Sequence, residues 1–389
     1  MAQSKGSIAI VGAGIGGLCS GVFLSRLGFE VTIYDQASRF GRVGAGIQQT
    51  PNAMKVHRKL GTEARLRQVA FQSPSGISRE WDTGNITNEL TLGDEVERRY
   101  GAPYLLMHRA DLHAALESVL PAGMVQFNRK LTGIEQNARA VTLAFADGSR
   151  VTADAVIGAD GVHSVVREWM LGPEKPRFSG RVAYRTTYPA RLLGAAQITP
   201  VRTKWWGPDR HMVVYYVTLS RDELYFVTSQ PEDAAWMTRE SWSQKGDLNV
   251  LRDAYAGFHP EVRAIVEACT EVHKWALMER DPLPRWCEGR VTLLGDACHP
   301  MTPYMAQGAA SALEDAAMLS RCLENVNADG IDGLTGAFRR YEANRLPRTA
   351  EIQQTSSKNT WMRSATDPTW VYGYDVWTAP LVDPDRAAA

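Results

Sequence analysis

The chain has 389 residues, 44% of them hydrophobic and 22% charged, a composition typical of a soluble globular protein large enough for two domains. Lysine plus arginine and aspartate plus glutamate both number 43, so no net charge favours nucleic acid or an anionic membrane. Five cysteines without paired short spacing predict no disulfide framework and no metal site, which fits the cytoplasm. We therefore expect a small-molecule partner, no stable membrane association, and a monomer or homodimer.

A dinucleotide-binding fingerprint stands at the start of the chain. Residues 7–11 predict a buried strand, residues 18–27 a helix and residues 29–35 a second strand. The turn between the first strand and the helix contains Gly12, Gly14, Gly16 and Gly17. In such a turn the first glycine permits the tight bend, the second lets a pyrophosphate approach the backbone, and the last lets the helix pack on the strand. The strands on both sides make a chance glycine-rich turn a much weaker reading.

Further candidates for cofactor binding follow the second strand. Asp35, 18 residues after the last fingerprint glycine, stands where an acidic side chain holds a ribose hydroxyl, and Gln36 is its neighbour. Arg42 and Gly46 lie in a glycine-rich loop that either reaches an adenosine or flavin edge or is merely solvated. Arg109 begins a predicted helix and either contacts phosphate or caps the first turn.

Two later segments each lead from a buried strand to an aspartate and a helix start. The strands are predicted at residues 155–158 and 291–294, and the second segment leads into a helix at residues 309–323. The amide-rich start of a helix favours anionic groups, although an ordinary strand-loop-helix unit explains either segment alone. The cofactor candidates in these segments are Asp160, Gly161, Asp296, Gln307 and Gly308.

Between these two segments the chain is rich in residues that favour strands. Strands are predicted at residues 182–188, 201–206, 211–217 and 223–228, which suggests an antiparallel sheet forming a wall for a substrate.

The last part of the chain predicts helices. They span residues 334–345 and 349–362, separated at Pro347, and an aromatic segment at 367–377 is expected to pack over the core.

The three motifs together resemble those of single-component flavoprotein aromatic hydroxylases. They are the glycine fingerprint with Asp35, Asp160-Gly161 with its following helix start, and Gly295-Asp296 with His299 and Pro300. The resemblance implies the 4-hydroxybenzoate hydroxylase-like α/β fold: a Rossmann-like FAD-binding domain with an inserted, mainly antiparallel β-sheet substrate domain. It places the first part of the FAD-binding domain at 1–174, the substrate domain at 175–280, and the completed FAD-binding domain with C-terminal helices at 281–389.

The resemblance also implies a reaction. In this family NADH or NADPH reduces FAD, O2 adds to the reduced flavin, and the resulting C4a-hydroperoxide hydroxylates an electron-rich ring. The expected substrate is therefore a small aromatic carboxylic acid with a ring hydroxyl. A salicylate-type or other hydroxybenzoate hydroxylase remains an alternative, and a flavin-binding sensor without turnover is a weaker one.

The inserted sheet resembles that of family members acting on 6-hydroxynicotinate, through residues 204–206 and 209–216. This implies a hydroxypyridine carboxylate as substrate and allows decarboxylation. Three positions depart from that subgroup's pattern, which has histidine at Gln48, cysteine at Arg202 and histidine at Tyr304. We treat these three residues as candidates for substrate binding, with Arg202 as a carboxylate clamp because its planar fork matches two oxygens.

The catalytic candidates are His211, Tyr215 and Pro303. His211 and Tyr215 stand four residues apart on a predicted strand and hence on one face, where they are candidates for proton transfer and for orienting the substrate. Without the resemblance, a histidine bonded within the sheet and a core tyrosine would be the simpler reading. The Pro303 carbonyl is a candidate for steering the oxygenated flavin.

Overall fold

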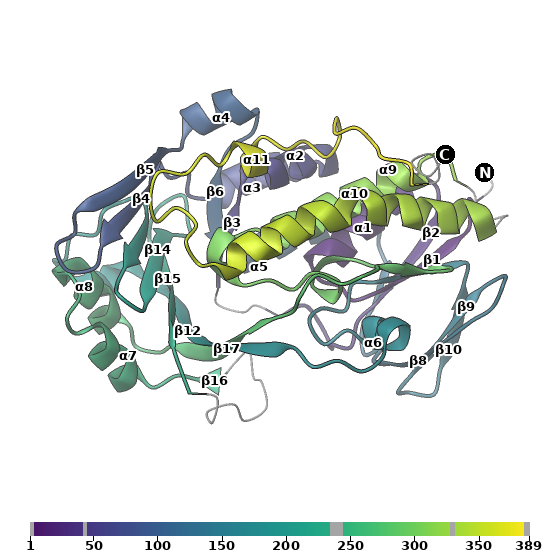
Figure 1. Ribbon diagram of the computed structural model, residues 1–389, viewed down its shortest axis with the longest axis horizontal. Helices are drawn as coiled ribbons and strands as arrows, with labels where there is room; N and C mark the ends of the chain where they lie inside the picture. Colours follow the sequence, from purple (N-terminus) through teal and green to yellow (C-terminus); the bar gives the residue numbers. More distant parts are fainter. Residues whose placement is uncertain (1–3, 42–44, 234–243, 327–330, 385–389) are drawn as a thin grey trace.

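The structure is a computed structural model that describes residues 4–41, 45–233, 244–326 and 331–384. It is an α/β protein built on a six-stranded and an eight-stranded sheet (Figure 1). The fold confirms the predicted combination of a Rossmann-like unit with a mainly antiparallel sheet.

The strands are β1 (Ser7–Val11), β2 (Glu30–Tyr34), β3 (Gly46–Gln49), β4 (Ser75–Glu80), β5 (Ile86–Thr91), β6 (Leu105–His108), β7 (Val125–Gln126), β8 (Leu131–Gln136), β9 (Val141–Phe145), β10 (Arg150–Ala153), β11 (Ala155–Gly158), β12 (Arg177–Pro189), β13 (Arg202–Trp206), β14 (His211–Tyr216), β15 (Glu223–Pro231), β16 (Gln244–Lys245), β17 (His273–Glu279), β18 (Cys287–Glu288) and β19 (Val291–Leu293). The helices are α1 (Ile15–Arg26), α2 (Pro51–Leu60), α3 (Glu63–Val69), α4 (Asp94–Tyr100), α5 (Arg109–Glu117), α6 (Val165–Leu171), α7 (Leu248–Tyr255), α8 (Pro260–Ala268), α9 (Gly308–Leu323), α10 (Ile331–Ser357) and α11 (Thr369–Tyr372).

The six-stranded sheet has the order β18-β19-β11-β1-β2-β7, and its pairs are parallel except at β18. Its central strands are short apolar runs, as expected for strands that are covered on both faces. Because β1, β11 and β19 are parallel neighbours, the loops that follow them meet at one edge of the sheet. These are the loops in which the sequence places its three motifs.

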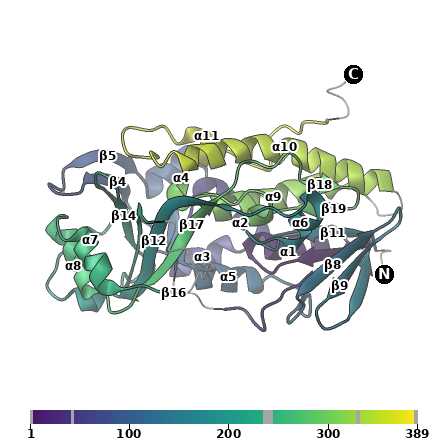
Figure 2. The same cartoon turned by 60° about the horizontal axis from the view of Figure 1, so that its bottom comes forward.

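The eight-stranded sheet has the order β16-β17-β12-β15-β14-β13-β4-β5. Its pairs are antiparallel apart from β13 with β4. Strands β4 and β5 come from residues 75–91, so the sheet combines the central segment with a hairpin from the first third of the chain. Figures 1 and 2 show this sheet, with α7 and α8, at one end of the molecule and strands β8 to β10 at the other.

The prediction of two helices separated at Pro347 is wrong. A single helix, α10, runs from Ile331 to Ser357 with Pro347 inside it (Figure 2). An internal proline costs about 3 kcal/mol because it lacks an N–H and crowds the preceding turn. Packing on α9 holds the helix across this point: Arg345 on one side of the proline and Arg348 on the other form ion pairs with acidic residues of α9.

The aromatic segment at 367–377 packs over the core, as predicted. Val371 and Tyr372 of α11 are buried, and Lys55 of α2 donates through Nζ to the Gly373 carbonyl (3.0 Å). Along the described ranges, none of the helices combines the length and apolar character that crossing a bilayer requires. All five cysteines are free, in agreement with the absence of a predicted disulfide framework.

Candidate active site

A cavity of about 360 Å³ opens where the loops after β1, β11 and β19 face the eight-stranded sheet. Eleven of the residues selected from the sequence line it: Gly14, Gly16, Gly17, Gly46, Gln48, Arg109, Gly161, Tyr215, Asp296, Pro303 and Gly308. These residues come from the loops after β1, β11 and β19, from the starts of α1, α5 and α9, and from strands β3 and β14. The predicted cofactor and substrate segments therefore converge on one space.

The fingerprint turn has the backbone shape that a pyrophosphate requires. Gly12 has φ +107°, a conformation that glycine adopts readily. A Cβ on Gly17 would lie 2.0 Å from the Gly12 carbonyl oxygen, so the start of α1 approaches β1 more closely than any side chain allows. Gly14 differs, because a Cβ there would meet no atom within 4 Å. Its backbone faces the open cavity.

The acidic residue after β2 fixes this turn. Asp35 accepts hydrogen bonds from the Ala13 amide (Oδ2, 2.7 Å) and from the Ala37 amide (Oδ1, 2.8 Å). Its role toward a ribose stays a prediction. Gln36 is exposed beside it, and Arg42 lies outside the described residues.

The aspartate of the second motif caps the helix that follows it. Asp160 accepts hydrogen bonds from Ser164 Oγ (2.5 Å) and from the Val165 amide (2.8 Å), so its carboxylate caps the start of α6. Burial raises the pKa of Asp160, and these hydrogen bonds oppose that rise. Gly161 lines the cavity, whereas the Asp160 carboxylate is already engaged.

The loop of the third motif is held in place by hydrogen bonds to a buried aspartate of α9. His299 is fully buried, and its Nε2 lies 2.5 Å from Asp315 Oδ2, which also accepts from the Gly295 amide (3.1 Å). His299 thus fixes the loop and leaves its neighbour Asp296 facing the cavity. Enclosure by protein raises the pKa of Asp296, while His299 and Arg109 act in the opposite direction.

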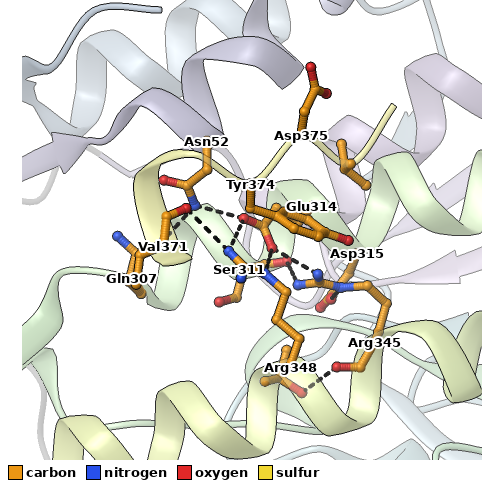
Figure 3. A network of polar contacts seen from close by, with 12 residues as sticks. Asn52, Gln307, Ser311, Glu314, Asp315, Arg345, Arg348, Val371, Tyr374 and Asp375 are labelled. Atoms are coloured by element: carbon orange, nitrogen blue, oxygen red, sulfur yellow. Dashed lines mark hydrogen bonds and ion pairs between the residues drawn. The ribbon is translucent and has the colours of Figure 1, made fainter. Parts of the chain in front are cut away.

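Figure 3 shows the polar network that joins α9 to its neighbours. Glu314 of α9 accepts from Asn52 Nδ2 (2.6 Å) and pairs with Arg348 and Arg345, which hold its pKa below the usual value although burial acts to raise it. Asn52 also donates to Gln307 Oε1 (3.0 Å). The Gln307 side chain, a predicted cofactor contact, therefore ties α2 to the start of α9, and the network sets where the start of α9 meets the cavity.

The eight-stranded sheet supplies the opposite wall of the cavity. Tyr215 is hydrogen-bonded to Gln48, which also accepts a hydrogen bond from Tyr104. Burial raises the pKa of Tyr215 well above its ordinary value, so the phenol stays protonated and is able to donate. His211 and Tyr215 share one face of β14, as predicted. The pairing with β15 is regular from His211, opposite Ser229, to Tyr215, opposite Tyr225, and residues four apart on a regular strand point to the same side.

Three predicted substrate residues, Arg202, His211 and Tyr304, do not line the cavity itself. Arg202 and His211 are buried on the sheet face that carries Tyr215, and the Tyr304 ring meets the His211 ring edge-to-face at 5.3 Å. The Tyr304 hydroxyl lies 2.9 Å from Ser229 Oγ. Tyr304 directly follows Pro303, which does line the cavity. The buried Tyr304 side chain is therefore one residue along the chain from the cavity lining.

Sequence reasoning missed three wall residues, Arg185, Tyr225 and Trp275. Arg185 stacks on Trp275, with its guanidinium carbon 3.9 Å from the ring centroid, and hydrogen-bonds to Tyr225. An arginine as the one charged residue of the strand predicted at 182–188 was the available signal. Burial lowers the pKa of Arg185, which still remains protonated at neutral pH.

The geometry fits FAD. The exposed backbone at Gly14 and the amide-rich starts of α1 and α9 all open on the cavity, and these are features that hold a pyrophosphate and an anionic ring. Arg109 adds a positive charge on the same surface.

Comparison with known proteins agrees with this geometry. The family described as "FAD binding domain" matches residues 5–356. The 6-hydroxynicotinate 3-monooxygenases of Bordetella bronchiseptica and Pseudomonas fluorescens are 48% and 45% identical to the chain, over 100% of both sequences in each case. A salicylate hydroxylase solved as a substrate complex superimposes with a TM-score of 0.82 and 25% identity, covering 96% of this chain and 97% of that one.

The chain therefore belongs to the FAD-binding-domain family. Within it, the chain is a FAD-dependent monooxygenase that acts on an aromatic ring and uses NAD(P)H and O2.

Proposed function

We propose that this monooxygenase hydroxylates 6-hydroxynicotinate or a related hydroxypyridine carboxylate. The observation that carries the proposal is Arg202, which is 9% exposed and has no hydrogen-bond partner at Nε. In the described part of the chain no carboxylate forms an ion pair with it. A buried guanidinium without a counter-charge is costly, and the carboxylate of a small aromatic acid would remove that cost. The two 6-hydroxynicotinate 3-monooxygenases that match the whole chain support the same substrate class.

Each part of the site then has a role. FAD would be held by the fingerprint turn, Arg109, Asp296 and the start of α9, and once bound and reduced it supplies the oxygen chemistry. The predicted contacts at Gly12, Asp35, Asp160 and Gln307 would act through the shape of the surrounding loops. The proposed domain division follows from this: residues 1–174 and 281–389 form the FAD side, and residues 175–280, joined by β4 and β5, form the substrate side.

The substrate side must keep the ring electron-rich. Arg202 binds the carboxylate, while Gln48 and Tyr215 orient the ring oxygen with an acceptor and a donor. Burial, with the positive charges of Arg181 and Arg202, holds the pKa of His211 well below its ordinary value. His211 therefore stays neutral, and we propose that it passes a proton on and does not remain protonated.

Pro303 and Tyr304 link the two sides of the site. Pro303 lines the cavity, and its carbonyl would orient the oxygen-transferring end of the bound cofactor. Tyr304 closes the substrate side over His211. If the acid carries its carboxylate on the attacked carbon, hydroxylation expels carbon dioxide.

A salicylate-type hydroxylase is the second candidate. The favouring observations are the departures at Gln48, Arg202 and Tyr304, together with the superposition on a salicylate hydroxylase. The two candidates differ in the ring that Gln48 and Tyr215 must recognise.

Substrate-dependent oxidation of NADH and NADPH tests the proposal. The FAD-loaded protein is assayed with 6-hydroxynicotinate, its positional isomers, salicylate and 4-hydroxybenzoate, and both product and carbon dioxide are quantified. We expect coupled product from 6-hydroxynicotinate or from one of its isomers. Coupled product from salicylate alone would establish the second candidate, and flavin reduction that no acid stimulates would favour a binding protein over an enzyme.

A further inference from the structure

A buried lysine stands in the substrate wall next to the residues discussed above. Lys204 of β13 is 1% exposed, and its Nζ has no hydrogen-bond partner among the described residues. Side chains alternate along a strand, so Lys204 shares its face with Arg202 and Trp206. Its Nζ lies 3.8 Å from the Trp206 ring centroid and 5.9 Å from that of Tyr304.

The charges around this amine are positive. Arg202 lies on the same strand, and Arg181 of β12 acts with Lys204 and Arg202 on His211 of β14. Arg363 lies near the same Trp206 ring as Lys204, with its guanidinium carbon 5.5 Å from the ring centroid. In the described residues no acidic side chain forms an ion pair with Lys204 or Arg202. The sheet face that carries the cavity-lining Tyr215 therefore also carries two buried nitrogen groups, Lys204 and Arg202, which do not line the cavity itself.

Two other lysines show how unusual this setting is. Lys274, on the same sheet, is paired with Glu232 (Nζ to Oε2, 2.5 Å), and Lys55 donates to two backbone carbonyls. Unpaired ammonium groups in an apolar interior are strongly disfavoured, and a buried lysine without a partner gives up its proton. Burial and the Arg202 charge accordingly hold the pKa of Lys204 well below its ordinary value.

We propose that Lys204 is the catalytic residue that finally accepts the proton of the substrate's ring hydroxyl and then holds the oxyanion. This inference rests on the proposed function, because it requires a substrate with both a carboxylate and a ring hydroxyl. The O–H bond of the hydroxyl breaks, an N–H bond forms at Nζ, and the neutral pair becomes an oxyanion and an ammonium. No other reactant is needed, and the net charge of the site does not change.

Charge balance explains why this wall contains two nitrogen groups. The Arg202 guanidinium matches the carboxylate, and Lys204, once protonated, matches the oxyanion. Neutral His211 is a poor final acceptor, because its imidazolium would be buried beside the charges of Arg202 and Arg181. The ionised hydroxyl makes the ring electron-rich, as electrophilic hydroxylation requires.

The test compares substrate ionisation with proton release. 6-Hydroxynicotinate is added to FAD-loaded enzyme without NADH in weak buffer at pH 8. The ultraviolet difference spectrum reports the ionised ring, and an indicator dye reports protons released to solvent. The variants are Lys204→Met, which removes the acceptor and keeps all but one atom of the side-chain length, and Lys204→Arg, whose side chain is already protonated. Lys274→Met is the control, since Lys274 follows His273 and precedes Trp275 and so faces away from the cavity.

In the wild type we expect an ionised ring with no net proton release. In Lys204→Arg we expect an ionised ring with release of about one proton per substrate, because arginine cannot accept it. In Lys204→Met the ring should stay protonated and turnover should fall at least about 100-fold, with thermal stability retained. The control should keep wild-type turnover and ionisation.

Three results would overturn the assignment. They are an ionised ring and turnover within twofold of wild type in Lys204→Met, proton release by the wild type, and no proton release by Lys204→Arg. A wild-type enzyme that neither binds nor hydroxylates 6-hydroxynicotinate but accepts another acid contradicts the proposed substrate instead, and the same readouts are then applied to that acid.

Discussion

Two glycines of the fingerprint turn have different physical roles at the residue scale. Gly14 has φ −73°, which any residue adopts, and open space where a Cβ would stand. Gly17 has the Gly12 carbonyl oxygen at 2.0 Å from that position. We therefore expect the first glycine to be required by the ligand and the second by the packing of α1 on β1.

Replacing each glycine with alanine separates these roles. Gly14→Ala should keep the stability of the wild-type apoprotein but weaken FAD binding at least about tenfold, about 1.4 kcal/mol, because its methyl group enters the ligand space. Gly17→Ala should lower the free energy of unfolding by about 1–3 kcal/mol, because the backbone must shift. Urea unfolding of the apoproteins and FAD fluorescence titration measure the two quantities. Equal stability losses in both variants would contradict this distinction.

Residue types and spacings identified the cavity contacts that come from loops. Gly14, Asp296 and Gly308 follow predicted strands, and parallel neighbours bring the ends of those strands together. Arg185 and Lys204 were not predicted as site residues, because both stand inside strands. A charged residue in a strand is expected to face solvent until the fold shows which face of the sheet is covered. The direction of a side chain in a sheet depends on which strands are its neighbours, and this is a long-range property.

At the scale of elements, helix α9 is fixed by buried charges. Arg345 of α10 pairs with Glu314 (Nη1 to Oε2, 2.8 Å) and with Asp315 (Nε to Oδ1, 2.7 Å), and all three side chains are fully buried. Since Asp315 also holds His299, the same pairs position the loop before α9. These contacts were not predictable, because sequence periodicity does not show which helices pack together.

Removing the arginine should destabilise the protein strongly. Arg345→Met leaves two carboxylates with reduced compensation in the interior, and we expect the free energy of unfolding to fall by about 3–5 kcal/mol. The exposed pair of Arg150 with Glu135 provides a control, and Arg150→Met should leave the free energy of unfolding nearly unchanged. Urea denaturation of both variants measures the difference. Similar small losses in the two would show that the buried network contributes little.

At the scale of the whole molecule, strand and helix patterns predicted a dinucleotide-binding unit and an antiparallel sheet, and the family resemblance implied that this sheet is an inserted domain. The patterns were not enough to place β4 and β5, which join the inserted sheet through the parallel pair of β13 with β4. Nor did it foresee the passage of α10 through Pro347, where contacts with α9 outweigh local preference. Local patterns thus predicted the elements, while the sharing of strands between segments and the long helix depended on tertiary packing.

In the proposed arrangement a ring acid would lie opposite the FAD side of one cavity, and oxygen from O2 would be transferred to the ring. The most direct test is mass spectrometry of the product formed from 6-hydroxynicotinate, NADH and isotopically labelled O2 by the FAD-loaded enzyme. The account predicts one labelled oxygen atom in each hydroxylated product molecule. An unlabelled product, or NADH oxidation that yields only hydrogen peroxide with every ring acid tried, would contradict it.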